Sequence, residues 1–203
     1  MMASSVAIVG IGFAGVTPMA YAEEGDSATV TNVPVSASNR LAGATRYETS
    51  KAVANATGLT ALTVPDTSPD ALVGSLLAAN SGKSAIMSKD APSLGGADRY
   101  ESAANAALKG NKYAALVVAN GTSTVDILTA TSFAANKGGN LLLVKTDEVG
   151  KYAAAALDEM QPASVTIVGG TGVVSEATKK AIESATGKTV TRISGADRYR
   201  PRW

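Results

Sequence analysis

Short apolar runs alternate along the chain with longer stretches in which apolar and polar residues are mixed. The runs are too uniformly apolar for a sheet with one face in water, and turn-forming residues follow most of them. They predict buried strands over residues 61–64, 85–87, 115–119, 141–144, 165–168 and 189–193. Strands that alternate with helices predict an α/β fold with a parallel sheet, covered by helices on both faces.

Helix-start signals occupy the stretches between these runs. The pairs Thr45/Glu48 and Asp98/Glu101 have the spacing of a capping box, in which the first side chain accepts from an early helical N–H group and the glutamate binds the backbone in return. They predict helices that end near residues 56 and 108. The other predicted helices have the N-caps Ser68, Thr124 and Ser175 and end near residues 82, 138 and 185, and one more is expected over residues 148–160.

Two sequence patterns recur along the chain. The pattern G-A-[TD]-R-Y begins at Gly43, Gly96 and Gly195. A second pattern, [ST]-x-D-x-L followed by A-A-N-x-G, contains Asp70 in one copy and Asp126 in the other, at an offset of 56 residues (126 minus 70). Two motifs that stay in phase over this distance indicate a repeat protein.

The composition narrows the range of functions. The chain contains neither cysteine nor histidine, which excludes disulfides, thiol nucleophiles, histidine-ligated metals and the Ser-His-Asp triad. With 18 basic and 17 acidic residues the net charge is +1, so the overall charge does not indicate nucleic acid as a partner. We therefore expect a protein that needs no cofactor and is not an enzyme, although carboxylate or lysine catalysis stays open.

The beginning of the chain has the pattern of a secretory signal peptide. An apolar stretch over residues 6–16 precedes Ala20-Tyr21-Ala22, a small-x-small cleavage pattern, and acidic residues follow at once. Residues 1–22 are therefore predicted to direct secretion, and we expect no membrane segment after cleavage. Residues 23–39 are small and polar, which predicts a linker.

The patterns R-I-S-G-A-D-R-Y at residues 192–199 and I-V-G-G at residues 167–170, together with the two D-x-L…A-A patterns, resemble the type 2 cell wall-binding repeats of Gram-positive bacteria. The resemblance implies flavodoxin-like or Toprim-like α/β units, usually three in tandem around a pseudo-threefold axis. It also implies a secreted surface protein, often associated with an S-layer, that binds an anionic, teichoic acid-like polysaccharide of the wall.

The spacing of the recurring glycines defines the expected units. It is 99 residues between the second and third copies (195 minus 96) but 53 between the first and second (96 minus 43). We therefore expect a shortened first unit over residues 40–93, a full second unit over residues 94–193 and the truncated start of a third over residues 194–203. Association of chains into a homo-oligomer with trimer-like packing would complete the family arrangement.

The resemblance and the residue chemistry together select candidates for contact with the polymer. Arginine side chains and backbone N–H groups at helix N-termini suit phosphate or carboxylate groups. The candidates are Arg40, Arg46, Arg99, Asp126, Gly170, Thr171, Arg192 and Arg198. Each also has a structural interpretation as a cap, an ion-pair partner or part of a tight turn. Two other hypotheses stay open, a secreted wall-active hydrolase on a flavodoxin-like scaffold and a non-functional, truncated fragment of a longer surface protein.

Overall fold

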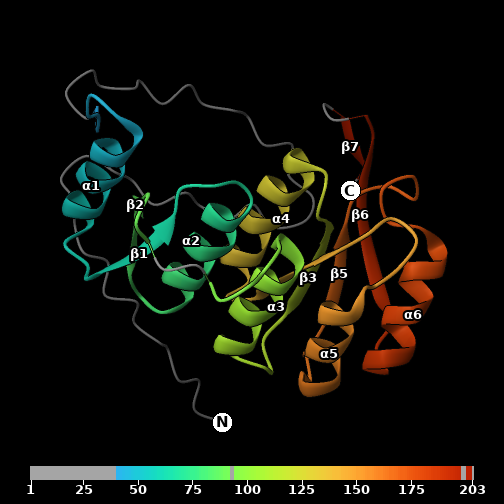
Figure 1. Ribbon diagram of the computed structural model, residues 1–203. Helices are drawn as coiled ribbons and strands as arrows, with labels where there is room; N and C mark the ends of the chain where they lie inside the picture. Colours follow the sequence, from blue (N-terminus) through green and yellow to red (C-terminus); the bar gives the residue numbers. More distant parts are fainter. Residues whose placement is uncertain (1–39, 92–93, 198–199, 203) are drawn as a thin grey trace, which may run out of the picture. The chain divides into compact units, whose positions relative to one another are not determined.

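The computed structural model describes residues 40–91, 94–197 and 200–202. The predicted signal peptide and linker, residues 1–39, lie outside the described residues, and so does Arg198. Residues 40–203 form one compact unit, whose helices and strands are labelled in Figure 1.

Residues 40–91 form the shortened first unit. Its elements are α1 (Arg46–Thr57), β1 (Ala61–Pro65), α2 (Asp70–Asn80) and β2 (Ser84–Ser88). The two strands pair in parallel, with Thr63 opposite Ile86. Among the described residues β1 has β2 as its only strand neighbour, so its other edge carries no strand.

The second unit repeats this order and then continues. Its elements are α3 (Arg99–Lys109), β3 (Leu116–Asn120), α4 (Thr124–Asn136), β4 (Asn140–Val144), α5 (Lys151–Glu159), β5 (Val165–Val168), α6 (Glu176–Thr186) and β6 (Val190–Asp197). The strand order is β4-β3-β5-β6, and these strands are all parallel. Numbered from β3, this is the order 2-1-3-4 that begins a flavodoxin-like sheet. The α/β fold with a parallel sheet is confirmed.

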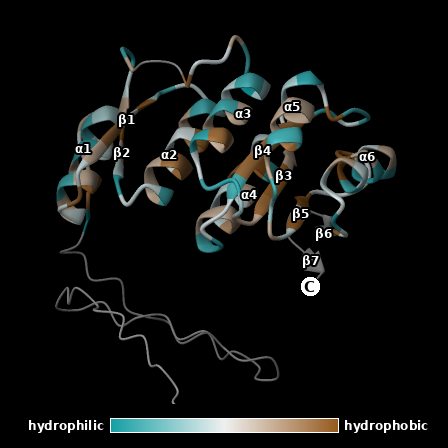
Figure 2. Ribbon diagram, turned by 90° about the horizontal axis from the view of Figure 1, so that it is seen from below, coloured by the Kyte–Doolittle hydropathy of each residue, from teal (hydrophilic) through white to brown (hydrophobic). Residues whose placement is uncertain are grey.

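Helices cover both faces of the second unit's sheet, as expected. One face packs against α5 and α6, with Leu157 and Ile182 buried in the same cluster as Val118 and Leu142. The other face packs against α4, and Ile127 belongs to that cluster. Figure 2 shows the hydrophobic strands β3, β4 and β5 between α4 on one side and α5 on the other. The helix α2 joins the two units, because Val73 and Leu76 lie in the cluster that contains Ala103 and Ala106 of α3.

The first predicted capping box is present in full, and the second differs in one bond. Thr45 Oγ1 accepts from Glu48 N, and the Glu48 carboxylate accepts from Thr45 N, both at 3.2 Å. Asp98 Oδ1 accepts from Glu101 N at 2.9 Å, but the Glu101 carboxylate accepts from Ala97 N rather than from the cap residue. Both helices begin directly after the predicted cap.

Three predicted boundaries were wrong. Ser123, not Thr124, precedes α4, and Pro69 stands at the cap position of α2 in place of Ser68, with no side-chain cap in either case. The helix expected from residue 148 begins only at Lys151, because Gly150 adopts a left-handed φ of 78° that a helix cannot contain.

The last strand was also placed incorrectly. The sequence predicted a strand that ends at residue 193 and a new helix start at the third G-A-D-R-Y copy. The strand β6 instead continues through Asp197 and pairs antiparallel with β7 (Arg200–Arg202). The third copy therefore begins with extended backbone, unlike Asp98 of the second copy, which caps α3.

Candidate functional site

Arginines bind the backbone or side chain that directly follows a strand in both units. In the first unit Arg46 Nη2 donates to Asp66 Oδ2 at 2.7 Å, one residue beyond β1. In the second unit Arg99 Nη1 donates to the carbonyl oxygen of Gly121 at 2.8 Å, one residue beyond β3. These two arginines are equivalent in the repeat, and both link a helix N-terminus to a strand end.

Tyr47 completes the strand-end contact in the first unit. Its hydroxyl donates to Asp66 Oδ2 at 2.5 Å, the same oxygen that accepts from Arg46. The Tyr47 hydroxyl, and then the Arg46 charge, hold the pKa of the Asp66 carboxyl below its usual range although burial acts in the opposite direction. Asp66 is therefore a carboxylate at neutral pH that fixes the position of the Tyr47 ring.

Arg192, a residue of β6, makes a comparable contact at the end of β5. Its Nη1 donates to the carbonyl oxygen of Gly169 at 2.8 Å, and its Nη2 forms an ion pair with Glu176 at 2.9 Å. The arginine side chain is 13% exposed, so most of the guanidinium lies against protein. Both of its described partners belong to the loop and helix that follow β5, and Arg192 therefore fixes that turn.

Asn120 closes the crevice in which open α/β sheets usually bind ligands. This crevice lies outside the carboxyl ends of β3 and β5, where the strand order reverses. The buried Asn120 amide donates to Thr146 Oγ1 at 3.1 Å and to the carbonyl oxygen of Val173 at 2.5 Å. Its oxygen accepts from Thr122 N at 2.7 Å. The Asn120 side chain thus ties together the loops after β3, β4 and β5.

The glycine-rich turn before α6 uses its polar groups internally. The Gly170 carbonyl oxygen accepts from Val173 N and Val174 N, which forms a tight turn. At the start of α6, Ser175 N donates to the carbonyl oxygen of Thr146, and Ser175 Oγ accepts from Thr178 N. Thr171 is exposed on this turn. The geometry is that of a capped strand-to-helix connection.

A groove of about 800 Å³ lies between α4 and the ends of β5 and β6. Asp126 and Gly170, two of the predicted residues, both line it. The other side chains along it are mainly apolar or hydroxylated, and none of its described lining residues is lysine or arginine. Gly169 is required at its edge, because its φ is 126° and a Cβ there would lie 2.7 Å from Val173 Cγ2. Since Asp126 brings the only described charge, the groove does not favour an anion.

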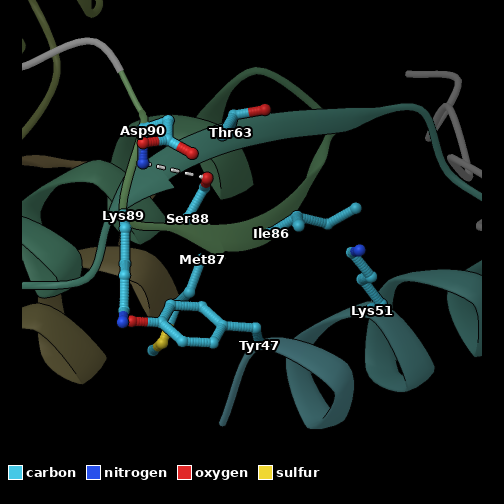
Figure 3. A pocket seen from close by; sticks show the side chains of 8 residues that line it. All are labelled: Tyr47, Lys51, Thr63, Ile86, Met87, Ser88, Lys89 and Asp90. Atoms are coloured by element: carbon cyan, nitrogen blue, oxygen red, sulfur yellow. Dashed lines mark hydrogen bonds between the residues drawn. The ribbon is translucent and has the colours of Figure 1, made fainter. Parts of the chain in front are cut away.

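The first unit contains a second hollow, of about 530 Å³, whose lining is cationic (Figure 3). Tyr47 and Lys51 reach it from α1, and Lys89 follows β2. In Figure 3 Lys51 points toward Ile86, while Lys89 extends toward the Tyr47 ring, and its Nζ lies 5.8 Å from the ring centroid. The remaining residues that line the hollow are Thr63, Ile86, Met87, Ser88 and Asp90.

The four predicted arginines that the structure describes do not gather in one groove. Arg46, Arg99 and Arg192 bind groups at three different strand ends, and Arg40 is exposed before α1. Sequence reasoning missed Lys51 and Lys89. A comparison of the two units could have identified Lys51, because it stands where the second unit has Ala104, at the offset of the G-A-[TD]-R-Y pattern (104 minus 51 is 53). The same comparison does not single out Lys89, because its equivalent is also a lysine, Lys145.

Comparison with known proteins agrees with this repeated architecture. The sequence pattern of the family described as cell wall binding domain 2 (CWB2) matches residues 40–92 and 93–179. The chain belongs to the CWB2 family. Membership of CWB2 confirms the resemblance noted in the sequence and assigns the chain to the proteins of the cell wall and cell surface.

Relatives of this CWB2 chain are longer proteins. Over 107 residues it is 35% identical to N-acetylmuramoyl-L-alanine amidase LytC of Bacillus subtilis (strain 168), a match that covers 52% of this chain and 21% of that protein. Its fold resembles Cwp6 and Cwp8 from Clostridium difficile, with TM-scores of 0.68 and 0.64 and 20% identity to each. Each comparison covers 78% of this chain, but only 33% of Cwp6 and 35% of Cwp8. The chain thus spans about a fifth to a third of these proteins.

The described part of the CWB2 chain has neither a cluster of metal ligands nor a membrane-spanning helix. No group of three or more acidic side chains there could hold a metal ion, and the chain has no histidine or cysteine to add to such a group. No helix in the same residues is long and apolar enough to cross a membrane.

Proposed function

We propose that this chain anchors a secreted protein non-covalently to the bacterial cell wall by binding an anionic secondary wall polymer. The observation that carries the proposal is the CWB2 match, because it covers the shortened unit and most of the full one. Both units carry an arginine at the same strand end, so each has a cationic group at an equivalent place.

The exposed cations supply the chemistry for such binding. Arg40, Arg46 and Arg99 are exposed, and a guanidinium can bind a phosphate or carboxylate group through two parallel hydrogen bonds. Individual contacts of this kind at a surface are weak. Two units on one chain, facing a polymer with many equivalent groups, gain strength through effective concentration.

The proposed role is binding without catalysis. The chain has no histidine and no cysteine, so the common general base and the thiol nucleophile are both absent. Asp126, the charged residue of the larger groove, has no second titratable side chain beside it among the described lining residues. The amidase activity in the name of LytC belongs to a protein of which this chain matches 21%. A wall-active hydrolase is therefore the weaker hypothesis.

The domain organisation that accompanies this proposal follows the sequence. Residues 1–22 act as a signal peptide and residues 23–39 as a linker. Residues 40–93 and 94–193 are the two wall-binding units, and residues 194–203 begin a third. Association of chains with trimer-like packing of units would increase the number of polymer contacts, and sedimentation velocity tests it.

Co-sedimentation with purified Gram-positive cell walls tests the proposal. The chain is mixed with intact walls and with walls whose secondary polymers have been removed by acid, and the protein in the pellet is measured. We expect binding to intact walls and loss of binding after the acid treatment. A folded sample that stays in the supernatant with intact walls contradicts the anchoring role, and equal binding to both preparations contradicts the polymer as the ligand.

A further inference from the structure

The open face of the first unit is the counterpart of a buried face in the second. Three of the residues that line the hollow have apolar equivalents there: Lys51 matches Ala104, Thr63 matches Val118 (118 minus 63 is 55) and Ser88 matches Val144 (144 minus 88 is 56). Ala104, Val118 and Val144 are at most 4% exposed, because α5 and α6 cover them.

The first unit has no equivalent of those covering helices, and its residues differ accordingly. Thr63 is exposed in the middle of β1, at a position where a parallel strand normally carries an apolar residue. A lysine and two hydroxyl side chains thus replace two valines and an alanine. Ile86 and Met87 keep the apolar character of their equivalents, Leu142 and Leu143. This face of the first unit therefore carries polar side chains at positions where the equivalent face of the second unit, covered by helices, is apolar and buried.

The two lysines of the hollow have no carboxylate partner among the described residues. Neither Lys51 nor Lys89 forms an ion pair there, whereas Lys145, the equivalent of Lys89 (145 minus 89 is 56), forms one with Glu148. Asp90 also lines the hollow, so its charged groups are two ammonium groups and one carboxylate. The Asp90 backbone N–H donates to Ser88 Oγ at 3.2 Å, which places both residues at the same end of the hollow.

We infer that this face of the shortened unit binds a sugar residue that carries a phosphate or carboxylate group. Lys51 and Lys89 approach the hollow from opposite sides and supply the positive charge for the anion (Figure 3). Thr63 and Ser88 offer hydroxyl groups to the sugar hydroxyls, and Ile86 offers an apolar surface. The volume of about 530 Å³ lies within the range of small-ligand sites.

Tyr47 gives this site a fixed wall. Its hydroxyl is bound to Asp66, which holds the ring in place at the side of the hollow. A rigid aromatic ring with its polar end already bonded offers contact area at little cost in side-chain entropy. The inference rests on the proposed function for the source of the sugar, but the site itself is defined by the first unit alone.

The binding chemistry is tested with small probes on the full chain. Glucose 6-phosphate, glucuronate, glucose and inorganic phosphate are each titrated, and amide chemical shifts are followed by NMR. We expect the two anionic sugars to shift the amides of residues 86–90 and of the first two turns of α1, with glucose much weaker. The relative response to glucose 6-phosphate and glucuronate distinguishes the phosphate from the carboxylate. Equal responses to glucose and to the anionic sugars, or no response to any probe, would overturn the inference.

A charge-matched pair of variants tests the residues. The double variant Lys51→Ala/Lys89→Ala removes both ammonium groups, and Lys180→Ala/Lys188→Ala removes two exposed lysines of the second unit. Lys51→Ala also restores the residue type of the second unit, so the fold is expected to persist. We expect the first variant to bind glucose 6-phosphate and intact walls about five- to tenfold more weakly, and the control to match the original chain.

The outcomes separate this inference from the proposed function. If the original chain binds walls and the Lys51→Ala/Lys89→Ala variant binds them and the probes equally well, the inference fails and the anchoring role stands. If the original chain does not bind walls, the anchoring role fails, while the probe titration still reports on the hollow. If sedimentation velocity shows a dimer that only the double variant abolishes, the face is an interface between chains and the inference is overturned.

Discussion

Lys145 and Glu148 form an ion pair just after β4, in the segment that leads to α5. Lys89 has the same place after β2 in the first unit, yet the next described element there is α3 of the second unit and not an equivalent of α5. The shortened first unit therefore differs in two linked ways: a sheet face is uncovered, and among the described residues Lys89 lacks the ion pair that its equivalent Lys145 forms. The proposed sugar site is a consequence of both.

Exchanging equivalent residues between the units tests whether the uncovered sheet face of the first unit is exposed to solvent. Ala104→Lys places an ammonium group in the cluster between α3 and α5, and we expect it to lower the free energy of unfolding by at least about 3 kcal/mol. Lys51→Ala is expected to change it by less than about 0.5 kcal/mol, because Lys51 is exposed. Urea unfolding measures both. Comparable losses in the two variants would mean that the first face is covered in solution.

Arg192 is expected to stabilise the turn before α6. Arg192→Ala removes a charge-assisted hydrogen bond to the Gly169 carbonyl oxygen and an ion pair with Glu176, from a side chain that is largely buried. We expect a loss of about 2 kcal/mol in the free energy of unfolding, measured with urea. The matched control is Lys145→Ala, which breaks an exposed ion pair and is expected to cost less than about 1 kcal/mol. Equal losses in the free energy of unfolding for Arg192→Ala and Lys145→Ala would show that Arg192 contributes no more than an exposed ion pair does.

The contact of Tyr47 with Asp66 is expected to make stability depend on acid pH. The Tyr47 hydroxyl, more than the Arg46 charge, lowers the pKa of Asp66 in the folded chain. Its stabilising contribution is therefore complete above the unfolded pKa of about 3.9 and is lost as the pH falls through the lower folded value. Tyr47→Phe should raise the Asp66 pKa, followed by NMR titration of its carboxyl carbon. It should also reduce the urea midpoint at pH 7, and the reduction should become smaller as the pH falls through the folded pKa of Asp66. An unchanged Asp66 pKa would contradict this reading of the contact.

Asp70 is expected to make the stability of the folded chain depend on pH in the opposite direction. Burial at the junction of α2 with α3 raises the pKa of its carboxyl, although the Arg99 charge opposes that effect. Asp70 Oδ1 is buried and has no hydrogen-bond partner among the described residues. The Asp70 carboxyl therefore binds its proton more tightly in the folded chain than in the unfolded chain, and stability falls as the pH rises from the unfolded pKa of about 3.9 through the higher folded value.

The variant Asp70→Asn checks this assignment. It keeps the shape of the side chain and removes the charge, so we expect a higher urea midpoint at pH 7 and no difference from the original chain at pH 3. Asp126→Asn, at the equivalent position of α4, is the control, because Asp126 faces an open groove. A lower midpoint for Asp70→Asn at pH 7 would show that the charge of Asp70 stabilises the junction.

The sequence predicted those parts of the fold that depend on local patterns. Apolar runs located the strands to within about a residue at most ends, because a buried parallel strand has little tolerance for polar residues. The Thr45 cap was identified for the same kind of reason, since its partners lie within one helical turn. The extension of β6 past residue 193 was missed because the third G-A-D-R-Y copy carries a helix-start signal that pairing with β7 overrides.

The site was harder to predict, because it depends on contacts between distant residues. The arginines were selected as candidates from the sequence, but their partners at the strand ends, such as Gly121 and Gly169, are backbone groups that no side-chain motif reveals. The closing of the usual crevice by Asn120 also requires three loops to meet. The hollow of the first unit results from residues that the chain lacks, and it becomes visible only when the units are compared position by position.

Direct titration of the wall polymer into the purified chain tests the central claim. Secondary polymer is released from Gram-positive walls by mild acid, and its binding to the full chain is measured by calorimetry at low and high salt. We expect saturable binding that weakens as the salt concentration rises, because the contact is between exposed cations and an anionic polymer. The absence of binding by a folded chain, or binding that is indifferent to salt, would contradict the claim that this chain is held on the wall by an anionic polymer.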